Sequence, residues 1–226
     1  MIEVKDLNIG YVSKKKTVSV FSNINLSFNS GELVGLIGDN GVGKSTLIKT
    51  LTGFIKPLAG TILIDKKDIL SFSAHDLSKT ISIVSTEKVG GFNLTVFDVV
   101  ALGRTPYISV FGKLNASDIE CVEKSLQTLS INHLRDKLID ELSDGQRQKV
   151  MIAKSLAQET SIIILDEPTA FLDYKSKHNL FEVLKSLCKE QNKLVLVSSH
   201  DIDLMEKYVT KSVALLSENS IEIKKY

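Results

Sequence analysis

The stretch GDNGVGKST, residues 38–46, follows the apolar segment ELVGLI and opens the helix-like segment KSTLIKTL. It matches the pattern GxxxxGK[ST], in which glycines let backbone N–H groups surround a phosphate at a helix N-terminus. Lys44 is placed to reach the β- and γ-phosphates of a nucleotide, and the Ser45 hydroxyl can ligate Mg²⁺. A glycine-rich turn without a ligand is the alternative, and the strand-loop-helix context disfavours it. The residues predicted to bind ATP are Gly38, Asp39, Asn40, Gly41, Val42, Gly43, Lys44, Ser45 and Thr46.

An acidic pair follows a second apolar segment, in IIILDEP at residues 162–168. Asp166 at the end of a buried strand is placed to hold Mg²⁺, as in other nucleotide hydrolases with a glycine loop. Glu167 beside it can act as a general base toward an attacking water. Such a pair alone could be only the polar end of a strand. Together with the glycine loop, it predicts nucleoside-triphosphate hydrolysis with Mg²⁺ as cofactor; the family resemblance described below implies ATP as the nucleotide.

Strand-like and helix-like segments alternate along the chain, which predicts an α/β fold with a largely parallel sheet. The segments 2–9, 18–28 and TILIDKKDI (residues 61–69) read as strands near the N-terminus. A helical texture then begins near Leu94, where Thr95 and Asp98 resemble a capping box. The apolar stripe of one helix there comprises Ile119, Val122, Leu126 and Leu129.

We predict a single domain over residues 1–226. Its nucleotide-binding core spans about 1–86 and 159–226, and a helical subdomain of about 87–158 is inserted into it.

The composition limits the class of protein. The formal charge is +1, with 43% hydrophobic and 24% charged residues, which is typical of a globular domain without broad attraction to nucleic acid. The longest uncharged run, residues 17–31, is rich in Ser and Asn, so no spanning helix is expected. The cysteines, Cys121 and Cys188, have no metal-ligand spacing and are expected to be reduced. We therefore expect a protein of the cytoplasm with no nucleic-acid partner.

A second candidate anion-binding loop, LSDGQRQ, occupies residues 142–148 and also precedes a helix-like segment. An N-capped amphipathic helix explains its serine but leaves its glycine and glutamine unexplained. The succession of GDNGVGKST, LSDGQRQ, IIILDEP, TAFLD and a histidine after VLVSS resembles the ATP-binding subunits of ABC transporters along essentially the whole chain. The fold implied is a P-loop NTPase core of ABC type, with an antiparallel β subdomain and an inserted helical subdomain.

The resemblance implies roles for further residues. Two copies would associate head to tail, so that each LSDGQ loop binds the γ-phosphate held by the other copy. Tyr11 would stack on adenine, and His200 would sense the γ-phosphate and act in catalysis with Glu167 and Lys44. The family's usual glutamine is replaced by Thr86 or Glu87, and neither is assigned a role. The residues that a partner copy would contribute are Ser143, Gly145, Gln146 and Asp173.

Asp144 stands where the family most often has glycine, so we expect its carboxylate to turn away from the phosphate and to support the helix N-terminus.

The segment ALGRTPY, residues 101–107, resembles the ALGRxPH-type segment of ATPases that serve importers for iron-siderophore complexes, haem and cobalamin. The group implies a homodimer on the cytoplasmic face of the membrane, bound to an integral-membrane permease and acting with an extracytoplasmic substrate-binding protein. A helix end broken by Pro106 is the alternative explanation of this segment. At the level of function, a soluble ABC ATPase linked to iron-sulfur assembly or nucleic acid is the alternative. The sequence does not identify the transported substrate.

Overall fold

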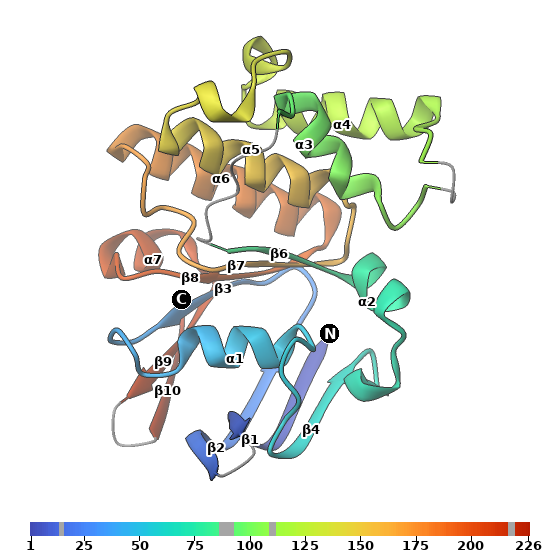
Figure 1. The fold of residues 1–226 in the computed structure, drawn as a ribbon. Coiled ribbons are helices and arrows are strands. Elements are labelled where there is room, and N and C mark those ends of the chain that lie inside the picture. Colours follow the sequence, from blue (N-terminus) through green and yellow to red (C-terminus); the bar gives the residue numbers. More distant parts are fainter. Residues whose placement is uncertain (14–15, 86–92, 109–111, 217–219) are drawn as a thin grey trace.

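The chain folds around two sheets that differ in strand direction, as the computed structural model shows for residues 1–13, 16–85, 93–108, 112–216 and 220–226 (Figure 1). The first sheet is antiparallel, has the strand order β2-β1-β4-β5, and comprises β1 (Ile2–Ser13), β2 (Lys16–Phe28), β4 (Ala59–Ile64) and β5 (Lys67–Asp68). The strand predicted over residues 61–69 is therefore a hairpin. Its turn residues, Asp65 and Lys66, have φ of 48° and 68°, which is the left-handed conformation that a tight hairpin turn requires.

The second sheet has the order β10-β9-β3-β8-β7-β6 and is parallel except for its edge strand β10. Its strands are β3 (Leu33–Ile37), β6 (Ile81–Val84), β7 (Ile162–Leu165), β8 (Leu194–Ser198), β9 (Lys211–Leu216) and β10 (Ser220–Lys225). The central strands are buried on both faces, because successive side chains enter different cores. Ile162 and Ile164 face the antiparallel sheet and α1 (Lys44–Leu51), whereas Ile163 and Leu165 face the helices on the other side.

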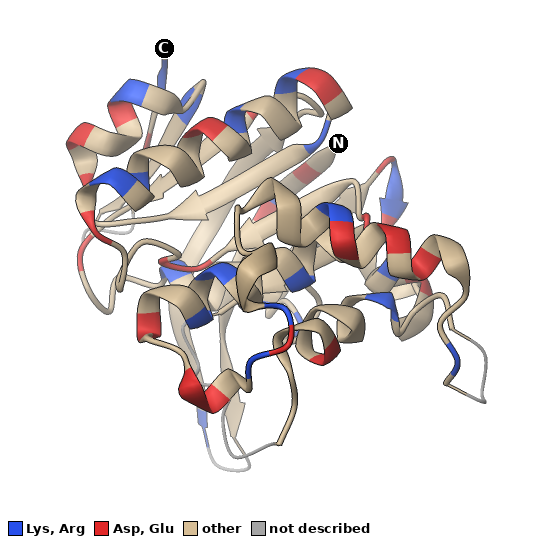
Figure 2. Cartoon of the chain, turned by 90° about the horizontal axis from the view of Figure 1, so that it is seen from above, with Lys and Arg blue, Asp and Glu red and all other residues tan. Residues whose placement is uncertain are grey.

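The helices that cover that other side form the upper layer in Figure 1. They are α3 (Val96–Ala101), α4 (Ala116–Thr128), α5 (Asp144–Ala157), α6 (Tyr174–Gln191) and α7 (Ile202–Tyr208). A small helix, α2 (Ala74–Thr80), precedes β6, and 3-10 turns lie at Ile69–Ser71, Leu102–Arg104, Asn132–Leu134 and Ile139–Glu141. Acidic and basic residues are interspersed along the outer helices (Figure 2).

The segment between β6 and β7 holds α3, α4 and α5, which agrees with the predicted helical insertion, although its boundaries near 87 and 158 stay a prediction. Thr95 caps α3 with the predicted capping box. In α4, Val122 and Leu126 are buried as expected, as is Leu129 directly after the helix, but Ile119 is 41% exposed. Within the described ranges, every helix is too short or too polar to cross a lipid bilayer.

Candidate nucleotide site

The glycine loop (residues 38–46) connects β3 to α1, as its strand-loop-helix context predicts. Gly41 has a φ of +80°, a conformation that only glycine adopts without strain. The first turn of α1 carries no acidic residue, so its N-terminal N–H groups offer an uncompensated positive dipole end to an anion. A cavity of about 140 Å³ opens at this loop, lined by Asn40, Gly41, Gly43, Lys44, Ser45, Thr46 and Glu167.

Lys44 is the cation of this cavity and is only 5% exposed. Its Nζ donates hydrogen bonds to the carbonyl oxygens of Gly38 (2.6 Å) and Asp39 (3.0 Å). Both hydrogen-bond partners of this ammonium within the described ranges are neutral carbonyls, which leave it able to attract an incoming anion. Lys44 is therefore held ready inside the loop, where phosphate oxygens can replace the carbonyls as its partners.

The carboxyl ends of β7 and β8 place the predicted catalytic groups beside the glycine loop. Glu167 follows β7, and its Oε1 lies 2.5 Å from Nε2 of His200, which follows β8. Glu167 also has a φ of 49°, a left-handed conformation that is unusual for a non-glycine residue and typical of functional sites. The structure thus brings Glu167, His200 and Lys44 to one end of the parallel sheet, the position that α/β folds use for ligands.

Ser198, the last residue of β8, organises this acidic end and was not predicted from the sequence. Its hydroxyl donates to Oδ1 of Asp166 (2.6 Å) and accepts from the backbone N–H of Glu167 (2.9 Å). The serine is fully buried. A polar residue that closes an otherwise apolar strand, two residues before His200, is the signal that could have identified it.

The donors predicted for Mg²⁺ are the Ser45 hydroxyl and the Asp166 carboxylate, which are hard oxygen ligands of the kind that this ion prefers. Among the described residues, no group of three His, Cys, Asp or Glu side chains forms a metal site by itself. One hydroxyl and one carboxylate fit an ion that also takes water and phosphate oxygens, as Mg²⁺ does in nucleotide sites.

Tyr11 reaches the glycine loop from the end of β1. Its hydroxyl lies 2.9 Å from Oγ1 of Thr46, and 48% of the residue is exposed. The ring is thus tethered beside the phosphate-binding helix with much of its surface available for stacking.

The LSDGQ loop (residues 142–146) forms a second, separate cavity of about 420 Å³, which shares no lining residue with the first. Ser143 caps α5 by accepting from the N–H of Gln146 (3.3 Å), and the Gln146 side chain accepts from the Ser143 N–H (3.1 Å). At Gly145 an added Cβ would lie 2.9 Å from the carbonyl oxygen of Phe171, so the glycine permits close backbone packing. The lining residues are Ser143, Asp144, Gly145, Gln146, Lys149, Phe171, Leu172, Asp173 and Ser176.

Asp173 belongs to this second cavity and caps α6. Hydrogen bonds from the backbone N–H (2.9 Å) and the hydroxyl (2.8 Å) of Ser176 lower the pKa of Asp173, so it stays ionised at neutral pH. The predicted partner-facing set, Ser143, Gly145, Gln146 and Asp173, is therefore together on one surface. The segment with Thr86 and Glu87 lies outside the described residues.

The ALGRTPY segment is largely structural. Gly103 lets the chain pass close to α5, where an added Cβ would lie 2.3 Å from the carbonyl oxygen of Lys154. Arg104 is 5% exposed; it donates to Asp118 (2.9 Å), to the carbonyl of Ala157 (2.8 Å) and to Glu159 (2.7 Å). The segment therefore anchors the C-terminal end of α5, the helix that carries the LSDGQ loop at its other end.

The geometry defines a P-loop nucleotide hydrolase with a glycine loop, a Glu-His pair and a second loop at a helix N-terminus. The family described as "ABC transporter" matches residues 21–170. An ABC transporter ATP-binding protein of Methanocaldococcus jannaschii, MJ0873, is 41% identical over 98% of this chain and 74% of its own length. The ferric enterobactin transport ATP-binding protein FepC of Escherichia coli is 35% identical over 93% of this chain and 76% of its own.

The fold is also similar to that of a solved ATP-binding cassette. The ATP-binding cassette MJ0796, as a dimer in a post-hydrolysis state with ADP and Pi, superposes with a TM-score of 0.85 at 25% identity, covering 100% of this chain and 98% of that one. The chain thus belongs to the ABC transporter family, as its motifs indicate. It is the ATP-binding component and an ATPase.

Proposed function

We propose that two copies of this chain form an ATP-closed dimer that powers a membrane importer for iron chelates. The observation that carries the proposal is that the glycine loop and the LSDGQ loop of one chain, each at a helix N-terminus, line two separate cavities. One nucleotide does not need both cavities of the same chain. A head-to-tail dimer with two-fold symmetry pairs each glycine loop with the partner's LSDGQ loop and so uses both. The dimeric cassette of MJ0796 supports this arrangement.

The chemistry follows from the groups at the sheet end. Lys44 exchanges its carbonyl partners for β- and γ-phosphate oxygens when ATP binds. Glu167 accepts a proton from the attacking water, and His200, whose Nε2 lies against that carboxylate in the separate chain, would turn its Nε2–H to the γ-phosphate when ATP binds. Ser45 and Asp166 would hold Mg²⁺, which neutralises phosphate charge when bound. The partner's Ser143 hydroxyl and Gly145 N–H then complete the site around the γ-phosphate.

Hydrolysis is thereby linked to opening and closing of the dimer. The partner's LSDGQ loop contacts the γ-phosphate only while that phosphate is attached, so ATP favours the closed state and phosphate loss removes the differential contact. Asp173 lies beside the LSDGQ loop and would report the state of one site to the other. Tyr11 would stack on the adenine.

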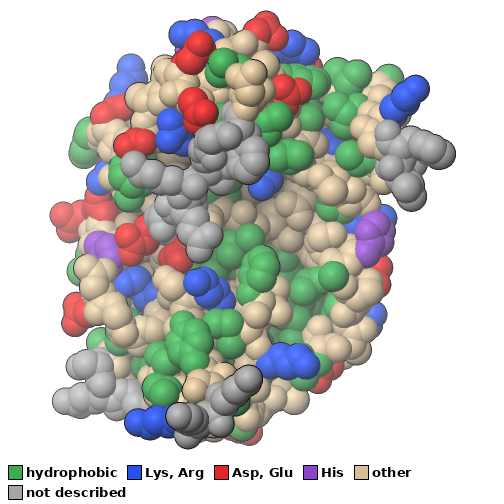
Figure 3. All heavy atoms as spheres, in the orientation of Figure 1, with side chains coloured by type: hydrophobic (Ala, Val, Ile, Leu, Met, Phe, Trp, Pro, Cys, Tyr) green, Lys and Arg blue, Asp and Glu red, His purple; other side chains and the backbone are tan. Residues whose placement is uncertain are grey.

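A permease would receive this motion at a groove between α5 and the rest of the core. The groove has a volume of about 350 Å³ and is lined by Thr52, Gly53, Phe54, Ala74, Leu77, Ser78, Ile81, Ile83, Lys154, Ser155 and Gln158. Phe54 is 72% exposed, and hydrophobic side chains gather at the surface between the helical and lower parts of the molecule (Figure 3). The partner proposed here is a cytoplasmic segment of the permease with an apolar face.

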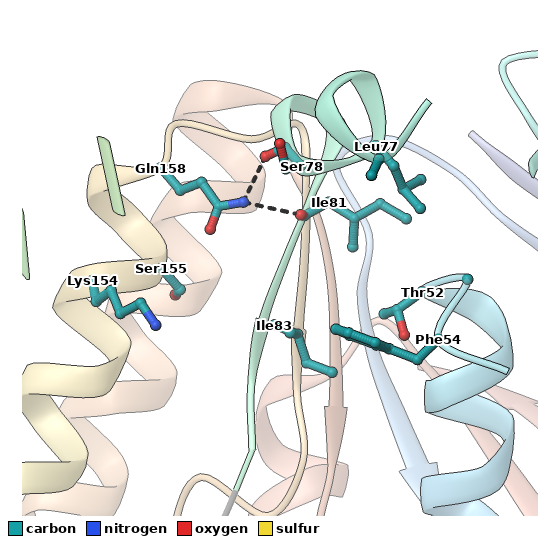
Figure 4. Close-up of a pocket in the computed structure, with 11 residues that line it drawn as sticks. Thr52, Phe54, Leu77, Ser78, Ile81, Ile83, Lys154, Ser155 and Gln158 are labelled. Atoms are coloured by element: carbon teal, nitrogen blue, oxygen red, sulfur yellow. Dashed lines mark hydrogen bonds between the residues drawn. The ribbon is translucent and has the colours of Figure 1, made fainter. Parts of the chain in front are cut away.

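The groove is lined by residues of both the helical insertion and the core, which suits a coupling surface. Gln158 after α5 donates to the carbonyl oxygens of Ser78 (2.6 Å) and Ile81 (3.2 Å), across from Phe54 (Figure 4). Tyr107 donates to the carbonyl of Gln158 (3.0 Å), so the ALGRTPY segment supports one wall. A segment docked there would contact α5 and the chain after α1, and thus both anion-binding loops through the helices that they open.

The iron-chelate substrate is proposed from the ALGRTPY segment together with the name of the relative FepC, which is a ferric enterobactin transport protein. Haem and cobalamin are the other substrates of the group that this segment resembles. The chain would work on the cytoplasmic face of the membrane as a peripheral subunit, and an extracytoplasmic protein would deliver the substrate. Uptake of labelled ferric siderophore, haem and cobalamin by cells with and without this chain tests the assignment: loss of haem or cobalamin uptake alone would contradict it.

The Glu167→Gln variant tests the dimer. It retains every binding group but lacks the base, so ATP should hold it as a dimer in gel filtration while hydrolysis falls at least about a hundredfold. ADP should leave it monomeric, which serves as the matched control. A variant that stays monomeric with saturating ATP at all protein concentrations would contradict the proposal.

A further inference from the structure

The LSDGQ loop carries an unusual charge for a surface that is to meet a triphosphate. Its cavity is lined by two carboxylates, Asp144 and Asp173, and by a single ammonium group, that of Lys149. The glycine-loop cavity has the opposite order, with a buried lysine at its centre and one glutamate at its edge. The two surfaces that we propose to contact phosphate therefore differ in charge: acidic side chains predominate at the LSDGQ loop, and a buried lysine is at the centre of the glycine loop.

Asp144 is the first residue of α5, and its side chain is 47% exposed. As expected, it leans toward its own helix: its Oδ1 lies 3.8 Å from Nη1 of Arg147. This is a distant ion pair, and Arg147 also donates to the carbonyl of Leu142 (3.4 Å). The carboxylate nevertheless remains in the lining of the cavity. Turning toward Arg147 therefore weakens its negative field at the loop without removing it.

In the proposed dimer, the N-terminus of α5 would lie close to two anions, the Asp144 carboxylate and the γ-phosphate held by the partner copy. In the separate chain, the N–H groups at the start of α5 favour the Asp144 carboxylate. In the closed dimer, the partner's γ-phosphate approaches the same N–H groups. We propose that Asp144 is an electrostatic restraint on closure, which destabilises the ATP-bound dimer so that the separate chains close weakly on ATP. This inference rests on the proposed head-to-tail dimer.

The size of the restraint follows from Coulomb's law near a protein surface. A carboxylate within about 6 Å of a γ-phosphate, at an effective dielectric constant of about 20, weakens closure by about tenfold or more for each site. The two sites of a dimer contribute together. Salt screens charges that face solvent, with a Debye length of about 10 Å at 0.1 M ionic strength, so the restraint should shrink as the salt concentration rises. A purely structural role of Asp144 would not produce this salt dependence.

The test measures the dimer dissociation constant with saturating ATP by sedimentation velocity, in the Glu167→Gln background that stops hydrolysis. Asp144→Asn keeps the size and a helix-starting side chain but removes the charge, and Asp144→Gly restores the residue usual in the family. Both should tighten the dimer about tenfold or more at low salt, with a smaller gain near 0.5 M salt. Glu120→Gln, exposed on α4 and outside the lining of both cavities, changes the net charge equally and should leave the constant unchanged.

The outcomes separate this inference from the proposed function. If the Glu167→Gln parent dimerises with ATP but Asp144→Asn and Asp144→Gly match it or dimerise more weakly, the restraint is wrong and the dimer stands. If the parent and both Asp144 variants stay monomeric although each binds ATP, the head-to-tail dimer itself is wrong. Equal tightening by Glu120→Gln would show a net-charge effect and would also overturn the role of Asp144.

Discussion

The glycine loop and the LSDGQ loop both present a helix N-terminus to a phosphate, but they are built for different tasks. The first surrounds a buried lysine whose ammonium is bound only to backbone carbonyls, and its helix has no acid in the first turn. The second has Asp144 in its first turn, and its capping hydrogen bonds are between Ser143 and Gln146. The first loop can bind an anion alone, whereas the second is suited to contact an anion that another chain already holds.

The two loops also differ in the elements that surround them. The glycine loop lies at the end of a parallel sheet, next to Glu167 and His200, where strands from distant parts of the chain fix its position. The LSDGQ loop depends on one helix, α5, and on its packing against the backbone of Phe171. We therefore expect nucleotide binding and chemistry at the end of the parallel sheet, and contact with a partner copy at the N-terminus of α5.

The largest expected effect comes from removing the cation of the first loop. Lys44→Ala should lower ATP hydrolysis at least about a hundredfold, because the developing charge on the phosphates loses its buried ammonium. The measurement is steady-state phosphate release at saturating ATP. Lys149→Ala, which removes the cation lining the second cavity, is the matched control and should lower hydrolysis far less. Equal losses would contradict the division of tasks between the loops.

A mixing experiment then asks whether the loops of two chains form one site. Gly145→Ala should inactivate the second loop, because its Cβ would overlap the carbonyl of Phe171. Mixed with Lys44→Ala, it forms heterodimers with one intact composite site, so activity should return to about a quarter of that of the unmodified chain for random, independent pairing. Each variant alone should be nearly inactive. A mixture as inactive as its components would show that the sites are not shared.

The parts of the molecule that were predicted from the sequence are those with local physical causes. The glycine loop, the acidic pair after β7 and the caps at Thr95 and Ser143 each depend on a few adjacent residues. The parallel sheet followed from apolar strands that alternate with helices. Such elements are predictable from the sequence, because the backbone chemistry of a turn or helix end is determined by its own residues.

The remainder depends on contacts between distant residues. Ser198 donates to Asp166, 32 residues away, and although it is the polar end of the apolar strand LVLVS, nothing in the sequence shows which carboxylate its hydroxyl contacts. Arg104 belongs to a recognisable segment, but its partners Asp118 and Glu159 lie 14 and 55 residues further on. The hairpin turn at Asp65 and Lys66 was missed because it lacks the glycine that usually provides a left-handed turn.

Replacement of Arg104 should affect the LSDGQ loop more than the glycine loop. Arg104→Met leaves the buried Asp118 carboxylate without its guanidinium and should lower the free energy of unfolding by about 3 kcal/mol. Because Arg104 also holds the end of α5, dimer-dependent hydrolysis should fall more than ATP affinity. Chemical denaturation and a nucleotide-binding titration measure the two effects. Arg135→Met, which breaks an exposed pair with Glu123, is the control and should cost less than about 1 kcal/mol.

The difference in unfolding free energy between the unmodified chain and Arg104→Met should also depend on pH. A backbone hydrogen bond from Asn115, and then Arg104, lower the pKa of Asp118. A carboxyl whose folded pKa is lowered contributes stability above its ordinary pKa of about 3.9 and loses it as the pH falls toward the folded value. The gap in unfolding free energy between the unmodified chain and Arg104→Met should therefore be full at pH 7 and shrink below about pH 4. A gap that does not change with pH would mean that the loss comes from packing alone.

The smallest expected effect concerns Tyr11. Its replacement tests how much of the ATP affinity comes from the glycine loop and how much from the stacked ring. Loss of a stacked ring costs about 1 kcal/mol, so Tyr11→Ala should weaken ATP binding about fivefold and leave the rate at saturating ATP nearly unchanged. Tyr11→Phe loses only the hydroxyl contact with Thr46 and should bind ATP like the unmodified chain. Isothermal titration with ATP and with inorganic triphosphate distinguishes the causes, because triphosphate has no base to stack. If Tyr11→Ala weakened both ligands equally, its role would be to support the glycine loop through Thr46 and not to hold adenine.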